Sequence, residues 1–223
     1  MPSASLIKEF EQLVGKENVF SSEADRQSYA YDAAVLKPMI PSLVVRPTEV
    51  EQLGQVVKRC YEEGIPMTVR GSGTNLTGGT IPDCSDTIVI LTTGLNKILE
   101  INTEDLYATV QPGVITAKFA AAVAAKGLFY PPDPGSMSVS TIGGNVAESS
   151  GGLRGLKYGT TKDYVMGRYA SPNTGYLVTR GTGTGKWATA TTLRRCWWVP
   201  KAPSRSRARL RSSSFRRRRL PRP

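Results

Sequence analysis

The sequence predicts an α+β fold, in which two small sheets and several helices hold ligand-binding loops between them. Short β-type apolar runs and amphipathic helical stretches follow one another through the first 130 residues. Two later β-type runs flank a Thr103-Glu-Asp105 turn, as in a hairpin. Two glycine-rich stretches, at 69–80 and 133–152, interrupt this pattern. A chain of 223 residues is long enough to bury a substantial core.

The N-terminal part predicts two short helices. Residues 5–14 place Leu6, Phe10 and Val14 at four-residue steps, which is typical of an amphipathic helix. A second small helix is expected around residues 23–29, ahead of two prolines.

A βαβ-like unit is predicted next. Residues 43–45 form a β-type run, and Thr48 with Glu51 is a candidate capping box for a helix that ends at Gly64. One face of this helix is apolar and consists of Val50, Leu53, Val57 and Cys60. A strand at 66–69 then leads into the first glycine-rich stretch.

The middle of the chain predicts a further strand, a hairpin and a helix. A continuous apolar strand is expected at 87–91, followed by hairpin strands at 98–101 and 107–110. The alanine-rich residues 116–126 predict a helix. Beyond Tyr130 the content of glycine, proline and serine predicts loops without regular structure.

Charge is distributed very unevenly along the chain. The sequence has 29 Lys+Arg and 18 Asp+Glu, but residues 168–223 hold 15 of the basic residues and no acidic one. The preceding part therefore has 14 basic and 18 acidic residues, a net charge of −4 against +15 for the tail. Such a tail, with Trp197 and Trp198, is compatible with RNA or DNA binding through phosphate contacts and base stacking. It is also compatible with a solvated, disordered arm.

Missing residue types narrow the possible chemistry. The sequence has no histidine, which excludes a Ser-His-Asp triad and a histidine metal site. Cys60, Cys84 and Cys196 have no CxxC spacing, so burial in a reducing compartment is favoured over metal or redox work. The N-terminus lacks a secretory apolar region, and no apolar run reaches the roughly 18 residues of a membrane span. We therefore expect a cytoplasmic protein.

The glycine-rich stretches carry the functional signal. Small side chains leave backbone amides free to approach an anion, so the two stretches predict loops around one phosphorylated ligand. Neither stretch matches a common nucleotide motif, and residues 181–186 lack the spacing of a Walker loop. The segment Gly71-Ser-Gly-Thr-Asn-Leu76 lacks the third glycine of a dinucleotide-binding fold.

Four ordered motifs make a more specific match. They are Arg70-Gly-Ser-Gly-Thr74, Pro131-Pro-Asp-Pro-Gly-Ser136, Thr141-Ile-Gly-Gly-Asn145 with Gly151-Gly152, and Lys157-Tyr-Gly159 followed by Asp163-Tyr-Val-Met-Gly167. Together they resemble the PCMH-type FAD-binding domain of the vanillyl-alcohol oxidase superfamily, in particular its glycolate oxidase and D-lactate dehydrogenase branch. The resemblance covers about residues 42–167 and implies a two-subdomain FAD-binding fold with small sheets and surrounding helices.

The resemblance also implies a set of cofactor contacts. It puts the first stretch on the FAD pyrophosphate, the second along the flavin and its ribityl-diphosphate chain, and Val165 at the adenine end. The candidate cofactor-binding residues are Arg70, Gly71, Ser72, Gly73, Thr74, Asn75, Pro134, Gly135, Ser136, Thr141, Gly143, Gly144, Asn145, Gly152 and Val165. A structural salt bridge is an equally good account of Arg70, as is a plain strand position for Val165, and Tyr158 favours packing over catalysis. Thr74 stands where covalent relatives have a histidine, which implies noncovalent FAD.

In complete members of the family, the implied chemistry is hydride transfer from the hydroxyl-bearing carbon of a 2-hydroxy acid, glycolate or D-lactate, to the flavin. The substrate-side groups of the family lie outside the resembling part, so we nominate no catalytic residue and expect no metal. Redox partner subunits, and peripheral membrane association through them, are compatible with the resemblance. Nucleic-acid binding is disfavoured by it.

The end of the sequence suggests a change of reading frame near Thr189. Residues 190–204 can be encoded so that reading one nucleotide earlier gives GYDLTALLVGSEGTL, a string that resembles the next motif of the family. Because tryptophan has a single codon, Trp197 and Trp198 force Val-Gly in that earlier frame. After Ser204 the excess of Arg, Ser and Pro is what off-frame reading of GC-rich coding sequence would give, and no core can form from it.

Three segments are therefore predicted. Residues 1–41 form an N-terminal helical segment, and residues 42–188 form an incomplete PCMH-type FAD-binding domain. Residues 189–223 form a disordered, basic, low-complexity tail that we interpret as off-frame. The chain is then either a truncated flavoprotein or an inactive frameshift product.

Overall fold

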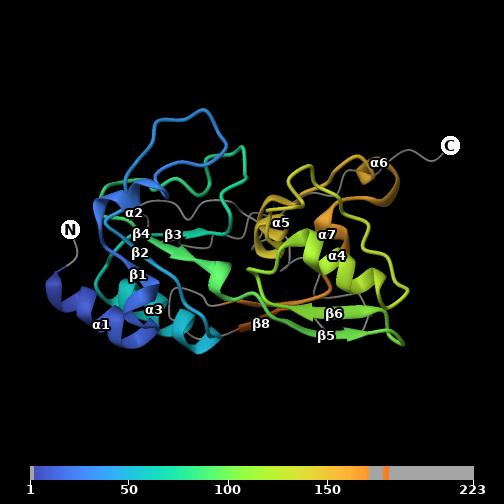
Figure 1. The fold of residues 1–223 in the computed structure, drawn as a ribbon, viewed down its shortest axis with the longest axis horizontal. Helices are drawn as coiled ribbons and strands as arrows, with labels where there is room; N and C mark the ends of the chain where they lie inside the picture. Colours follow the sequence, from blue (N-terminus) through green and yellow to red (C-terminus); the bar gives the residue numbers. More distant parts are fainter. Residues whose placement is uncertain (1–2, 171–177, 181–223) are drawn as a thin grey trace, which may run out of the picture.

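The computed structural model describes residues 3–170 and 178–180. Its largest sheet has the strand order β1-β2-β4-β3. The strands β2 (Leu43–Val45), β4 (Ile88–Leu91) and β3 (Met67–Arg70) run parallel, and β1 (Val19–Phe20) pairs antiparallel with β2 at one edge. Helix α3 (Val50–Glu62) connects β2 to β3 (Figure 1). The predicted βαβ-like unit and the α+β class are both confirmed, with β4 inserted between the two strands of the unit.

Both faces of the two central strands, β2 and β4, are covered, which explains why these strands are continuous apolar runs. One face packs against α1 (Ala4–Val14) and α3 in a core that contains Leu6, Phe10, Val14, Val19, Leu43, Val45, Val56, Val57, Cys60, Ile88 and Ile90. The other face presents Val44, Val89 and Leu91 to the partly buried rings of Phe20 and Tyr29. Because side chains alternate between faces along a strand, neighbouring residues of β2 and β4 enter different cores.

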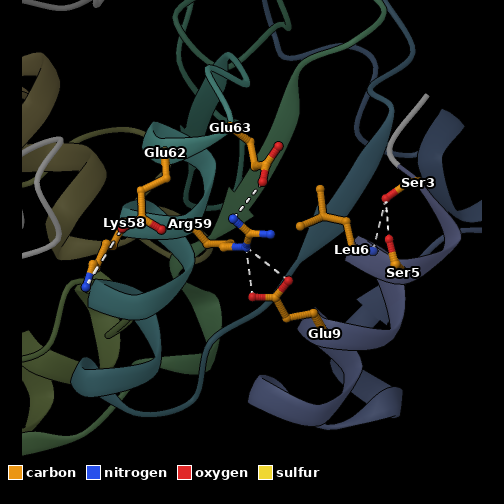
Figure 2. Close-up of polar contacts among 8 residues, drawn as sticks. All are labelled: Ser3, Ser5, Leu6, Glu9, Lys58, Arg59, Glu62 and Glu63. Carbon is orange, nitrogen blue, oxygen red and sulfur yellow. Dashed lines mark hydrogen bonds and ion pairs between the residues drawn. The ribbon is translucent and has the colours of Figure 1, made fainter.

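Ion pairs accompany the apolar contact between α1 and α3. Figure 2 shows the Arg59 guanidinium between two carboxylates, 2.8 Å from Glu9 Oε1 and 2.6 Å from Glu63 Oε1. These side chains are about one third to one half exposed, so each pair contributes at most about 1 kcal/mol to the free energy of folding. The buried Phe10 and Val56 therefore hold α1 on α3 more strongly than the charges do.

The start of α3 differs from the sequence prediction. Its N-cap is Glu49, and the Gln52 side chain accepts hydrogen bonds from the backbone N–H groups of Glu49 and Thr48. The predicted capping box of Thr48 with Glu51 is therefore wrong by one residue. Because the helix begins at Val50, its third residue is Gln52, and an amide oxygen takes the role that was expected of a carboxylate.

A second region is built on the hairpin of β5 (Ile98–Asn102) and β6 (Tyr107–Val110), which confirms the predicted pair. Helix α4 (Thr116–Ala124) lies beside this hairpin (Figure 1). Their shared core contains Val114, Phe119, Val123 and Ile142, with Ile98, Ile101 and Val110 packed against it.

The prediction of loops beyond Tyr130 is wrong for three short segments. The structure has α5 (Ile142–Glu148), α6 (Gly155–Tyr158) and α7 (Thr161–Tyr164) there. The Thr141 side chain caps α5, and Gly143 lies so close to Pro112 that a Cβ would be 2.7 Å from the proline Cβ. Tertiary contact of this kind overrides the low helix propensity of two adjacent glycines.

The remaining described elements are short. They are η1 (Lys16–Asn18), α2 (Glu23–Gln27), η2 (Thr92–Gly94), and the antiparallel pair of β7 (Arg168–Ala170) and β8 (Val178–Arg180). The segment before residue 41 thus supplies an edge strand as well as helices. The tail predicted at 189–223 lies outside the described residues.

Candidate functional site

The first glycine-rich segment begins where β3 ends, at Arg70, and borders a pocket of about 520 Å³. In Figure 1 the chain that follows α2 and the chain that follows β3 run together at one end of the four-stranded sheet. The pocket is lined by Ser28, Tyr31, Asp32, Ala33, Arg70, Ser72, Gly73, Thr74 and Ser136. Its volume is in the range of small-molecule sites.

Backbone amides of the first segment are available to a ligand. Within the described part of the chain, the N–H groups of Ser72, Gly73 and Thr74 donate to no protein acceptor. All three residues line the pocket. Successive free N–H groups in a turn attract an anion, so this wall of the pocket has the chemistry of a phosphate site.

Arg70 adds a buried positive charge beneath these amides. Its side chain is 7% exposed, and Nη1 donates to the Tyr31 backbone oxygen at 2.6 Å and to Thr80 Oγ1 at 3.3 Å. The guanidinium also lies over the ring of Tyr29, 5.7 Å from its centroid. Burial lowers the pKa of Arg70 from its ordinary value, and the negative charge of Asp32 opposes that shift. Among the described residues no carboxylate forms a salt bridge with Arg70, so its charge is not paired directly.

Asp32 ties the first segment to the chain after α2. Asn75 Nδ2 donates to Asp32 Oδ2 at 2.7 Å, and Thr80 Oγ1 lies 3.2 Å from the same oxygen. The backbone N–H of Ala34 donates to Asp32 Oδ1 at 2.8 Å. Sequence reasoning missed Tyr31 and Asp32, because the Tyr-Asp pair belongs to no glycine motif and its partners are about 40 residues away in the sequence.

The two glycine-rich stretches meet at Gly71 and Thr141. A Cβ on Gly71 would collide with Thr141 Oγ1, so only glycine allows this approach. The Ser72 hydroxyl donates to the Val139 backbone oxygen. Ser136 lines the same pocket as Ser72, Gly73 and Thr74. The structure therefore brings Ser136 and Thr141 beside the first stretch.

Residues 141–145 offer fewer free donors than the first segment. The N–H of Gly143 donates to the Pro112 backbone oxygen at 2.7 Å. The N–H of Gly144 donates to Thr141 Oγ1 at 3.3 Å. Asn145 is 1% exposed, and its Nδ2 donates to Thr116 Oγ1 at 2.7 Å. These residues form a closely packed wall rather than an open nest of amides.

The other candidate residues lie outside the lining of this pocket. Pro134 is buried, and Gly135 is exposed with open space where a Cβ would stand. A Cβ on Gly152 would collide with the Asp133 backbone, and the Asp133 carboxylate lies 3.4 Å from Arg154 Nε. Val165 is partly buried just after α7. The geometry groups Gly152 with the proline-rich turn rather than with Arg70.

Metal-ligand clusters and membrane-spanning helices are both missing from the described residues. Within residues 3–170 and 178–180, no group of three or more Cys, Asp or Glu side chains is placed to hold a metal ion. In the same part of the chain no helix has the length and apolarity needed to cross a bilayer.

Known proteins similar to this chain give the site a context. The family model described as "FAD binding domain" matches residues 41–181. The glycolate oxidase subunit GlcD of Bacillus subtilis (strain 168) is 52% identical over 156 residues, which are 70% of this chain and 33% of that protein. The D-lactate dehydrogenase of Anaerostipes hadrus is 34% identical over 188 residues, which are 84% of this chain and 39% of that protein.

The fold of the chain is also similar to those of solved structures. Alkyldihydroxyacetonephosphate synthase superposes with a TM-score of 0.73 at 20% identity, covering 83% of this chain and 37% of that one. At this identity the likeness concerns the fold alone. The match spans between a third and two fifths of the length of the Bacillus and Anaerostipes proteins.

Proposed function

Because this chain belongs to the family of FAD-binding domains, we propose that it is the flavin-holding part of an oxidoreductase that acts on a small 2-hydroxy acid. The family expected from the four sequence motifs is confirmed, and FAD is its cofactor. The observation that carries the proposed activity is the 52% identity with a glycolate oxidase subunit over 70% of the chain.

The residues of the pocket fit the diphosphate of FAD. We propose that the free N–H groups of Ser72, Gly73 and Thr74 hold its oxygens, with the buried charge of Arg70 behind them. Gly71 and Thr141 keep the two stretches in contact, so a second wall with Ser136 can lie along the same ligand. When bound, FAD supplies a flavin ring that accepts a hydride.

The protein's own residues bind and orient. Side-chain contacts such as those of Ser72 with Val139 fix the pocket wall before the ligand arrives, which reduces the entropy lost on binding. The sequence contains no histidine, so we propose that FAD is held without a histidyl bond. The roles of Pro134, Gly135, Gly152 and Val165 in cofactor binding remain proposals based on the family motif.

Substrate, partners and location are proposals of the same kind. Glycolate and D-lactate are the substrates that the names of two relatives suggest. The Bacillus protein is named as a subunit, which supports association with redox partner subunits. Free thiols at Cys60 and Cys84 support a reducing, cytoplasmic location. Neither of these two relatives is named for nucleic-acid binding. We therefore do not propose nucleic-acid binding on the basic composition alone.

A flavin titration of the purified 223-residue chain tests the proposal. The fluorescence of FAD should be quenched on binding, and the flavin should dissociate when the protein is precipitated with acid. Riboflavin should bind more weakly, because it lacks the diphosphate that the amide groups and Arg70 would contact. Flavin that stays with the acid precipitate would contradict noncovalent binding, and equal affinity for riboflavin and FAD would contradict the diphosphate site.

A further inference from the structure

We propose that Asp32 is a positioning residue that shapes the first glycine-rich segment for the diphosphate of FAD. This inference rests on the proposed function of the pocket. Asp32 belongs to none of the glycine motifs and lies in the chain between α2 and β2. It is 8% exposed and lines the same pocket as Ser72, Gly73 and Thr74.

Both oxygens of this carboxylate have fixed partners. Oδ1 accepts the Ala34 N–H at 2.8 Å, which sets the orientation of the carboxylate within its own turn. Oδ2 then accepts from Asn75 Nδ2 at 2.7 Å and lies 3.2 Å from Thr80 Oγ1. The carboxylate therefore holds two points of the glycine-rich segment that are five residues apart.

Anchoring through side chains explains why the amides of the segment are available. A loop normally fixes its shape by pairing its own backbone N–H and C=O groups. Here the hydrogen bonds of Asn75 and Thr80 fix the segment, and the N–H groups of Ser72, Gly73 and Thr74 stay without a protein acceptor in the described part of the chain. A preformed row of donors binds an anion without a further cost of ordering.

The negative charge of Asp32 is partly offset by the nearby guanidinium of Arg70. Thr80 Oγ1 lies between Asp32 and Arg70, accepting from Arg70 Nη1 at 3.3 Å. The guanidinium therefore lies one hydroxyl away from the carboxylate, and the neutral Asn75 amide donates a hydrogen bond to it directly. Its hydrogen bonds also keep Asn75 Nδ2 directed at Asp32 rather than at the pocket.

The test compares Asp32→Asn with Asp83→Asn in the full chain. Asp83 is an exposed aspartate in the connection between β3 and β4, which also contains the glycine-rich segment. Its substitution should leave the affinity for FAD within twofold of the wild type. Asp32→Asn removes a charged acceptor from two donors and should weaken FAD binding by about tenfold or more. In hydrogen exchange at saturating FAD, the variant should lose the protection of residues 71–77 while keeping that of the core strand β4.

A second pair of variants tests the same contact in case the Asp32→Asn protein does not fold. Thr80→Ser keeps the hydroxyl and should bind FAD nearly as the wild type does, whereas Thr80→Val should weaken binding about tenfold. Equal affinities of Thr80→Ser and Thr80→Val, or an Asp32→Asn affinity within threefold of the wild type, would overturn the inference and leave the flavin site standing. Failure of the wild-type chain to bind FAD would instead overturn the proposed function.

Discussion

Gly73 is the residue at which we expect the proposed diphosphate site to be most sensitive to substitution. Its φ is +72°, and a Cβ there would collide with the Arg70 guanidinium. Gly73→Val should therefore abolish FAD binding, because a branched side chain disfavours this φ, displaces Arg70 and blocks the approach of phosphate to the amides. Fluorescence titration with FAD measures the effect. Gly155→Ala is the matched control, since nothing lies within 4 Å of the position of its Cβ. Flavin retention like that of the wild type in Gly73→Val would remove the segment from the site.

Cys60 gives the core a specific dependence on pH. Burial raises the pKa of its thiol from an ordinary value of 9.0 to about 12. The unfolded chain loses this proton above about pH 9 while the folded protein keeps it, so stability falls as the pH rises from about 9 to about 12. The full loss from this one group is about 4 kcal/mol, at 1.36 kcal/mol per pKa unit.

Urea unfolding of the wild type and of Cys60→Val at pH 8 and pH 10.5 measures this dependence. Other groups titrate alike in the two proteins, so the difference between their unfolding free energies isolates the thiol. We expect the wild type to lose about 2 kcal/mol more than the variant over this interval. Equal losses would mean that Cys60 is not buried as described.

At the residue scale, the sequence predicts backbone requirements better than side-chain networks. The glycines at 71 and 73 could be singled out because only small residues leave amides accessible, and the structure gives each a close neighbour. Asp32 could not be predicted, since its meaning depends on contacts with Asn75 and Thr80 that only the folded chain creates. The salt bridge considered for Arg70 is replaced by hydrogen bonds to Tyr31 and Thr80.

At the element scale, packing rather than charge should hold α1 on α3. Phe10 is fully buried between α1 and the sheet, so Phe10→Ala should lower the free energy of unfolding by about 3–5 kcal/mol. Glu9 is 42% exposed and pairs with Arg59, so Glu9→Gln should lower it by less than about 1 kcal/mol. Chemical denaturation of both variants compares the contribution of apolar burial with that of the ion pair. A larger effect of Glu9→Gln would show that the ion pairs dominate.

The elements most accurately predicted are those whose apolar pattern decides their structure. The strands at β2 and β4 and the helix α1 have patterns that match their burial. Helix α5 was missed because Gly143 and Gly144 disfavour a helix, and its stability depends on Thr141 and on the contact with Pro112. The start of α3 was misplaced because two neighbouring residues could each serve as the N-cap. Thr48 is followed three positions later by Glu51, and Glu49 by Gln52, and either pair could form a capping box.

At the scale of the whole molecule, the tail should contribute nothing to the FAD-binding part. Residues 189–223 lie outside the described residues, and every charged residue from 168 onward is basic, 15 in all. A sequence with like charges and few apolar residues has little apolar surface to bury against the domain. Deleting residues 189–223 should change the free energy of unfolding by less than about 1 kcal/mol, measured by thermal denaturation. A large loss would show that the tail packs on the domain and would contradict an off-frame origin.

Turnover requires more than a bound flavin. The match spans between a third and two fifths of the length of the Bacillus glycolate oxidase subunit and the Anaerostipes D-lactate dehydrogenase. Hydride transfer needs the substrate held close to the flavin, and orientation of this kind accounts for about 7–11 kcal/mol of barrier lowering. The described residues show the pocket that we assign to the diphosphate but no group that we can assign to the carboxylate of a substrate.

We therefore expect the 223-residue polypeptide, saturated with FAD, to show no dye-linked oxidation of glycolate or D-lactate above a no-enzyme control. A version with the reading frame restored at Thr189 and extended to the length of the relatives should recover that activity. The Gly73→Val form of the extended protein is the matched negative control, because it should lack flavin. Substantial turnover by the 223-residue chain would show that the groups that orient the substrate are already within it, and the division between flavin-holding and substrate-holding parts would then be wrong.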